Sequence, residues 1–308
     1  MNRFIRYWNQ NRFKIIITLI IVVFIWLLIY IINSILANVP QESINTNVTI
    51  QDSSKPTESV ITGEEMPEET VNENTNLIQK FVSLCNEKNY NEAYNLLSTD
   101  CKEEVFTTID DFKRNYVDKI FTSNKTYTLE LWFNTNVEYT YRIVYIEDNI
   151  LSSGTIDTIN NKEDYITIIK ENNEKKLNLN GFIAKEKIGN TSRQNNIEIT
   201  VNNKLTYRSY EQYNITIKNN TNSTIKISDG QDGKEICLID SNEVEYDSAI
   251  NEISISDLII EPGSTKNLSI KFYKIYNLYR TITKIRFKSI NTDINNTIPN
   301  VISIDINI

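Results

Sequence analysis

The sequence contains no histidine, and this absence excludes more chemistry than any other feature of its composition. It removes Ser-His-Asp and Cys-His nucleophiles, histidine general bases and histidine-ligated metals. The three cysteines (Cys85, Cys101 and Cys237) are too few and too scattered for an all-cysteine zinc site or a disulfide framework. We therefore expect no catalytic, cofactor-binding or metal-binding residues, and a protein that is not an enzyme.

Positively charged residues are also fewer than negatively charged ones. The 308 residues carry a net charge of −8, and no block of basic residues follows the N-terminal segment. Nucleic-acid binding depends on lysine and arginine contacts to phosphates, so this balance argues against a nucleic-acid partner. The length is sufficient for two ordinary domains.

One long apolar run stands near the N-terminus. Residues 15–32 read IIITLIIVVFIWLLIYII, and the apolar character continues to Ala37. A run of about 20 apolar residues is long enough to cross a bilayer as a helix. Four basic residues and no acid precede or accompany it, which places the N-terminus in the cytoplasm. The sequence thus predicts a cytoplasmic segment at 1–14, a transmembrane helix at 15–37, and a single-pass cell-membrane protein with its C-terminal domains outside. The alternative is a cleaved signal peptide, whose apolar core is normally shorter.

The next segment is acidic and poor in apolar residues. Residues 38–75 contain three prolines and the run Glu64-Glu65-Met66-Pro67-Glu68-Glu69. Such a composition cannot bury a core, so we expect a disordered acidic linker.

Residues 76–188 change from a helical to a strand period. Leu77, Phe81 and Leu84 lie on one helical face, and a later helix has its buried stripe at Ile109, Phe112, Tyr116 and Ile120. Strands are expected at Tyr127–Phe133, Val137–Ile146, Leu151–Ile159, Tyr165–Lys170 and Lys175–Leu179. Helices followed by an antiparallel sheet indicate an α+β domain.

This order resembles the nuclear transport factor 2-like fold, a curved, cone-like sheet wrapped on helices. The stretches that carry the resemblance are FVSLCNEKNYNEAYNLLS and YITIIKENNEKKLNLNGF. The resemblance implies either an extracytoplasmic module of a conjugation or secretion-like assembly, or a protein with a pocket inside the cone. The tyrosines placed to line such a pocket are Tyr116, Tyr127, Tyr139, Tyr141 and Tyr145. Tyrosine at alternate strand positions is more often sheet packing, which is the interpretation we prefer.

Other side chains of this domain have structural interpretations. Asp110, Asp111, Glu103 and Glu104 have the positions of acids at helix starts, where the helix dipole favours them over general acid-base work. Cys85 lies on the buried stripe and is expected to be a core thiol. A disulfide between Cys85 and Cys101 is the alternative, because the expected compartment is oxidising.

Residues 196–308 alternate between apolar and polar, after a predicted hinge at 189–196. The expected strands are Ile197–Val201, Tyr213–Lys218, Thr224–Ser228, Glu235–Ile239, Ile253–Ile260, Thr265–Phe272, Thr283–Phe287 and Val301–Ile306. Short strands at this spacing predict an all-β sandwich. The phrases YNITIKNNTNSTIKI and LIIEPGSTKNLSIKF resemble bacterial immunoglobulin-like modules.

Two acidic groups in this region invite a metal interpretation. The run Asp229-Gly230-Gln231-Asp232-Gly233 lacks the ligand spacing of a calcium loop and is interpreted as a hairpin turn. The acids Asp240, Glu243, Glu245 and Asp247 would make at most a weak cation site.

The predicted function follows from this organisation. We expect a non-enzymatic, membrane-anchored interaction or scaffold protein that holds protein partners, with a subunit of a membrane-spanning assembly as its specific form. The alternative is a small-ligand-binding or catalytic protein that uses the pocket of the α+β domain.

Overall fold

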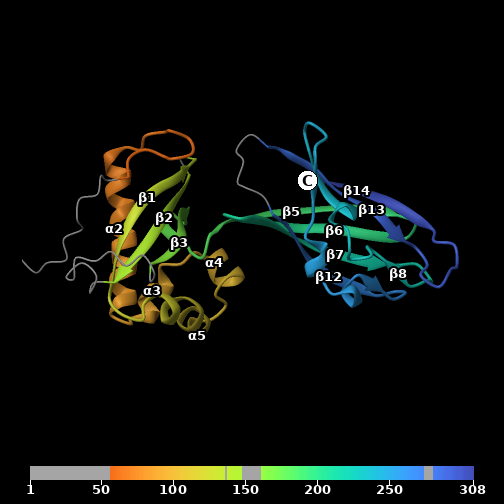
Figure 1. Cartoon of the computed structure of the whole chain (residues 1–308), viewed down its shortest axis with the longest axis horizontal. Helices are drawn as coiled ribbons and strands as arrows, with labels where there is room; N and C mark the ends of the chain where they lie inside the picture. The colour runs from red at the N-terminus through yellow and green to blue at the C-terminus, as the bar shows by residue number, and fades with distance from the viewer. Residues whose placement is uncertain (1–55, 136, 148–160, 274–279) are drawn as a thin grey trace, which may run out of the picture. The chain divides into compact units, whose positions relative to one another are not determined.

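The computed structural model describes residues 56–135, 137–147, 161–273 and 280–308 (Figure 1). All of them belong to one unit, Ser53–Ile308. The predicted strand at Leu151–Ile159 lies outside the described residues, as do the predicted cytoplasmic segment and membrane span.

The predicted transmembrane helix is corrected by the structure. No helix in the described part of the chain is long and apolar enough to cross a membrane, and residues 15–37 fall outside that part. The longest described helix, α2 (Glu68–Asn86), has 19 residues but buries only one face and carries glutamate, asparagine and lysine on the others. The predictions of a single-pass membrane fold and of a cell-membrane localisation are therefore not retained. The described chain is mostly β-sheet, with few and mainly short helices.

The helices come first and are capped by the side chains that their sequence supplies. They are α2 (Glu68–Asn86), α3 (Tyr90–Asn95), α4 (Thr99–Glu104), α5 (Ile109–Phe112), the π-helix η1 (Lys113–Val117) and α6 (Asp118–Ile120). Ser98 accepts a hydrogen bond from the Cys101 amide, and Thr108 accepts one from the Asp111 amide. Both are standard N-caps that satisfy free amides of the first turn.

The predicted disordered linker is partly wrong. Helix α2 begins at Glu68, nine residues before the predicted helical face, and it buries Val71 and Asn74 completely. Ahead of it, Met66 is buried and the Ser59 hydroxyl donates to the Trp132 carbonyl over 3.2 Å. The acidic composition hid these few buried positions, because one apolar residue per helical turn is enough to pack a face.

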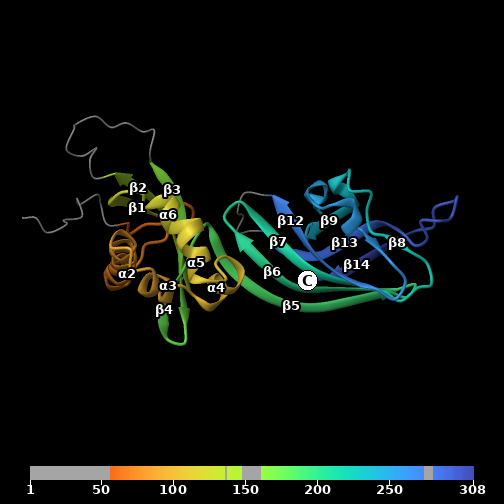
Figure 2. The ribbon, with the colours of Figure 1, turned by 90° about the horizontal axis from the view of Figure 1, so that it is seen from below.

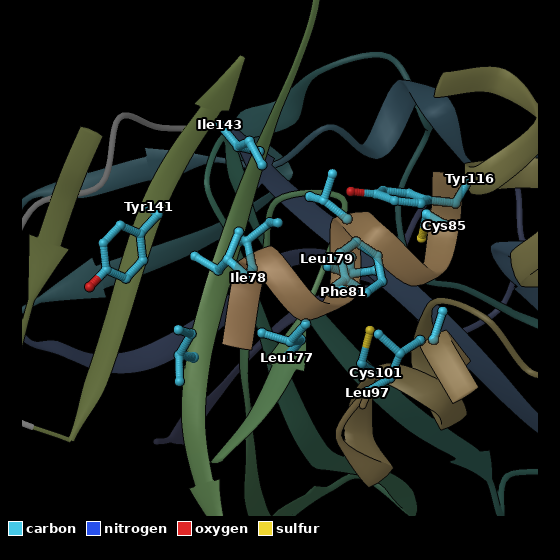
Figure 3. Packing of buried hydrophobic residues seen from close by; sticks show 14 of the residues in the cluster. Ile78, Phe81, Cys85, Leu97, Cys101, Tyr116, Tyr141, Ile143, Leu177 and Leu179 are labelled. Atoms are coloured by element: carbon cyan, nitrogen blue, oxygen red, sulfur yellow. The ribbon is translucent and has the colours of Figure 1, made fainter. Parts of the chain in front are cut away.

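The first sheet is antiparallel and follows the helices. Its strands are β1 (Lys125–Asn134), β2 (Glu138–Glu147), β3 (Lys162–Glu171) and β4 (Glu174–Asn178), in the order β1-β2-β3-β4. Asn172 and Asn173 both have positive φ and make the β3–β4 turn, so the strands predicted at Tyr165–Lys170 and Lys175–Leu179 form a hairpin. Helix α2 lies beside this sheet (Figure 1), and their apolar faces share one core. Figure 3 shows Ile78 and Phe81 of α2 packed near Leu177 and Leu179 in that core.

Two further antiparallel sheets follow and share a second core (Figure 2). The second sheet has the order β12-β7-β6-β5 and consists of β5 (Phe182–Gln194), β6 (Ile197–Tyr207), β7 (Tyr210–Asn219) and β12 (Thr265–Tyr273). The third sheet has the order β10-β9-β13-β8-β11 with β14 paired to β13, and consists of β8 (Ile225–Lys226), β9 (Ile236–Asp240), β10 (Glu245–Asp247), β11 (Ile259–Ile260), β13 (Ile282–Asn291) and β14 (Val301–Asn307). Isoleucine at every second position, as in Ile197 and Ile199 of β6, fills this core from both sheets; Ile199 pairs with Ile217 of β7.

Two predictions in this region are wrong. The predicted hinge at 189–196 is the end of β5 and its turn into β6, with Asn195 and Asn196 at positive φ. The predicted strand Ile253–Ile260 is mostly irregular: a 3₁₀ turn at Ile255–Asp257 precedes the two-residue strand β11. The Gly230 loop packs there against Ile255 and Leu258, which ties the segment to a loop.

Candidate functional site

Asp164 is a buried ionisable residue of the helical half of the described chain, which comprises the helices and the first sheet. It stands on β3 with 8% of its surface exposed. The Tyr116 hydroxyl donates to its Oδ2 over 2.7 Å, and the Asn180 amide donates to the same oxygen over 3.1 Å. The Tyr165 amide donates to Oδ1 over 2.7 Å. Because the Tyr116 proton is used on Asp164, the Tyr145 hydroxyl, 2.9 Å away, donates to Tyr116.

Burial controls the pKa values of the three hydrogen-bonded side chains, Asp164, Tyr116 and Tyr145. Removal from water raises the pKa of Asp164 to about 6, against the opposing effect of the Tyr116 and backbone hydrogen bonds. Burial, followed by the charge of Asp164, also raises the pKa values of Tyr116 and Tyr145 well above their usual range. Tyr116 lies on the π-helix η1, a distortion that is frequent at functional sites. Asp164 therefore has a raised carboxyl pKa of the kind that a general acid or base has, although the side chain is buried.

The raised pKa of Asp164 predicts a pH-dependent stability. The folded state holds its proton up to about pH 6, whereas the unfolded carboxyl releases it near 3.8. The contribution of this group is thus fully present below pH 3.8 and is lost as pH rises through 6. We expect the unfolding free energy of the native chain, minus that of Asp164→Asn, to fall by about 2–3 kcal/mol between pH 4 and pH 7. Urea unfolding at several pH values measures the difference, and a flat or rising difference would contradict the assignment.

The tyrosines predicted for a pocket lie in the core instead. Tyr141 and Tyr145 are fully buried, and Tyr116 is nearly so. Tyr141 accepts a hydrogen bond from Asn74 Nδ2 over 3.1 Å, and Figure 3 shows it on a strand of the first sheet. Tyr127 and Tyr139 are partly buried and pack on the same core. The packing interpretation fits these positions better than a pocket lining does.

The other candidates of the helical half have structural partners. Asp110 and Asp111 occupy the first turn of α5. Glu103 and Glu104 both pair with Lys185 of β5, at 2.9 and 2.8 Å. Cys85 and Cys101 are buried free thiols, so the disulfide alternative is wrong.

The acids of the sandwich do not gather around a cation. Asp240 accepts hydrogen bonds from the Asn242 and Val244 amides and from the Tyr246 hydroxyl. Glu243 pairs with Lys284, and Glu245 pairs with Lys288 and Arg286. The remaining acids, Asp247 and the Asp229–Gly233 group, join no cluster of metal-binding side chains within the described ranges.

The second sheet presents a surface of a different kind. Along its strands, many residues that alternate with the buried isoleucines carry short, uncharged, polar side chains that face away from the core. We call these residues the polar lattice: Thr191, Thr200, Asn202, Asn203, Gln212, Asn214, Thr216, Asn267 and Ser269. All nine are exposed or half-exposed. The same face also carries charged residues at its edges and between these positions: Lys187, Arg193, Glu198, Lys218 and Lys271. The nine uncharged side chains form one group across four strands, with Lys187 opposite Asn203 and Lys271 opposite Gln212.

Hydrogen bonds between side chains run across the strands of the lattice. Thr191 bonds to Thr200 at 2.8 Å on the β5–β6 pair. Thr216 Oγ1 accepts from Asn202 and donates to Asn267, both at 2.8 Å.

A neighbouring row of the lattice centres on Asn214. Its Nδ2 donates to Asn203, while its Oδ1 accepts from Ser269, both at 2.8 Å, and from Gln212 at 3.0 Å. These bonds fix the orientation of the amides and leave further donor and acceptor positions directed to solvent.

Aromatic rings close one end of the same face. Tyr207 and Tyr210 stack with centroids 4.5 Å apart and planes at 19°. Tyr273 of β12 meets Tyr210 edge to face at 5.8 Å, and 55% of its surface is exposed. The Tyr273 hydroxyl donates to Glu252 over 2.7 Å, which holds the ring in place. Tyr273 pairs with Tyr210 in the register, so the exposed ring stands on the same face as the lattice.

Comparisons with known proteins give no independent guide to this site. No protein family matches the chain, and searches of curated proteins and of solved structures also found no match. The resemblances to the nuclear transport factor 2-like and immunoglobulin-like folds therefore stay predictions.

The polar lattice was missed by sequence reasoning, although a signal for it is present. In β6, β7 and β12 the positions between buried apolar residues are repeatedly Thr, Asn, Gln or Ser. A solvated strand face in this chain would be expected to carry charges, as the outer face of β13 does with Lys284, Arg286 and Lys288.

Proposed function

We propose that this chain is a non-enzymatic interaction module that holds its partner on the outer face of the second sheet. The observation that carries the proposal is the polar lattice, a group of uncharged side chains that hydrogen-bond to one another across the strands of one sheet. Preorganised side chains lose little conformational entropy on binding, which favours a recognition role. The membrane-spanning assembly expected from the sequence depended on the withdrawn anchor and is not retained.

The rival function, catalysis or ligand binding in the helical half, has Asp164 as its best support. A raised carboxyl pKa is a property of general acids and bases. However, both oxygens of Asp164 are occupied by donors from Tyr116, Tyr165 and Asn180, and the residue is buried. These contacts favour a role in fixing β3 to η1, so we assign no reaction to this group.

A charge placed within the lattice tests the proposal. Asn267 is exposed on β12, so Asn267→Glu should leave the fold intact but place an uncompensated charge in the binding face. We expect the full chain to migrate in a complex in gentle extracts of the cells that produce it, and this variant to migrate as free chain. Size-exclusion chromatography with detection of the chain measures the shift.

The matched control is Asn307→Glu, the same substitution at an exposed position of β14 in the third sheet. It should remain in the complex. Equal behaviour of the two variants, or a native chain that migrates alone, would contradict an interaction module that uses this face.

A further inference from the structure

We infer that the partner held on the polar lattice is a polysaccharide strand; this inference rests on the proposed function and specifies its ligand. Three properties of the face determine the choice: the kind of polar group, the distribution of charge, and the position of the exposed ring.

The polar groups of the lattice match hydroxyl-rich ligands. Amide and hydroxyl side chains both donate and accept hydrogen bonds, as sugar hydroxyls do. Asn214 uses one Nδ2 proton on Asn203, and Asn267 uses its Oδ1 to accept from Thr216, so one Nδ2 proton of Asn214 and the Nδ2 protons of Asn267 stay available. The lattice therefore offers oriented donors and acceptors in rows that run across the strands. Successive rows are two residues apart along each strand, because every second side chain faces the same side of the sheet.

The charge distribution disfavours the other classes of partner. The nine lattice residues carry no charge. Of the charged residues on the same face, Arg193 pairs with Glu198 and Lys271 pairs with Glu252, which leaves few cations for the phosphate contacts of a nucleic acid. Among the aromatic, arginine and aliphatic residues that usually anchor protein interfaces, the lattice itself has none, and the exposed Tyr273 is a single ring at the end of the face. A membrane surface would need an apolar or basic face, and the lattice is neither.

The exposed ring completes the face. Tyr273 lies on the same face of β12 as the lattice residue Ser269, four positions further along the strand, with Lys271 midway between them. Sugar rings have apolar C–H faces that pack on aromatic rings, while their hydroxyl edges meet polar neighbours. Tyr273 is held by Glu252 and by the edge of Tyr210, so its orientation is fixed before a ligand binds.

Affinity electrophoresis of the purified full chain tests this inference. The probes are native gels that contain soluble neutral polysaccharides: a mixed-linkage glucan, a galactomannan, a xylan and a dextran. We expect at least one of them to retard the chain, and the retardation to persist at high salt, because salt does not screen contacts between uncharged side chains and a neutral polysaccharide. Tyr273→Ala and Asn267→Glu should each weaken the retardation by more than about tenfold.

Two controls keep the result specific. Tyr273→Phe preserves the ring and should retain most of the retardation, and Asn307→Glu should behave as the native chain. Retardation by none of the polysaccharides, retardation that salt abolishes, or equal effects of Asn267→Glu and Asn307→Glu would overturn the inference. If the chain nevertheless forms a cellular complex that Asn267→Glu alone disrupts, the proposed function stands with a protein partner. If no complex forms either, both fall.

Discussion

Arg280→Met is expected to lower the free energy of unfolding by about 3–5 kcal/mol, because it removes the positive charge that pairs with the buried carboxylate of Glu211. Arg280 Nη2 lies 3.3 Å from Glu211, and the side chains of the pair are 3% and 12% exposed. The guanidinium also covers the ring of Tyr246 at 4.2 Å. Burial raises the pKa of Glu211 and Arg280 opposes that rise, so its removal makes the charged form of Glu211 costly.

A double-mutant cycle separates this cause from a loss of packing. Glu211→Gln combined with Arg280→Met removes both charges, so the double variant should be more stable than Arg280→Met alone. Arg193→Met is the surface control, because Arg193 pairs with Glu198 while 73% of its side chain is exposed. Urea unfolding measures the native chain, the two single variants Arg280→Met and Glu211→Gln, the double variant and Arg193→Met. A small effect of Arg280→Met, or a double variant less stable than the single one, would show that the pair is not buried as described.

Phe112→Ala is expected to cost about 3–5 kcal/mol of stability, the range for removing a large aromatic ring from a packed core. Phe112 is completely buried and stacks on Tyr116 at 5.9 Å with planes at 15°. Phe106 meets it edge to face at 5.5 Å. The loss therefore removes the centre of an aromatic cluster that positions η1 and, through Tyr116, Asp164.

The control for Phe112→Ala is on the same short helix. Ile109 opens α5 with 37% of its surface exposed, so Ile109→Ala should change stability much less. Guanidinium unfolding followed by far-ultraviolet circular dichroism measures both. Equal losses for the two variants would mean that α5 does not bury Phe112 preferentially.

Ile109 also shows how far the helical pattern predicted this region. The predicted stripe contained Ile109, Phe112, Tyr116 and Ile120, of which Phe112 and Tyr116 are buried while Ile120 is half-buried. The π-helix η1 precedes Ile120, and its wider turn changes the direction of the following side chains relative to a regular α-helix. Ile109 lies ahead of η1, at the first residue of α5, so the π-helix does not account for its exposure. A local hydrophobic period cannot signal such a bulge.

Strand β5 shows the corresponding limit for the sheets. Its residues 185–194 read KEKIGNTSRQ, which has neither an apolar period nor β-branched enrichment. The strand is held by its pairing with β6, interrupted by an irregularity between Lys187 and Asn190. Tertiary pairing of this kind overrides local propensity, and the sequence alone predicted a hinge there.

The candidate face was within reach of the sequence only in part. The alternation of Ile with Thr or Asn in β6 and β7 correctly predicted strands with one buried side. What the sequence did not supply is the register that brings Thr191, Thr200 and Thr216 into one row. Register depends on turns and bulges between distant segments, so the rows become visible only in the folded sheet.

Site-specific photocrosslinking tests the central claim, which is that the partner binds on the outer face of the second sheet. A benzophenone amino acid placed at Ser269 of β12, and separately at Asn307 of β14, reports what lies against each sheet in the cells that produce the chain. The account predicts an abundant adduct from position 269, containing carbohydrate, and little or none from position 307. Equal adducts from both positions, or an adduct from position 307 alone, would contradict it.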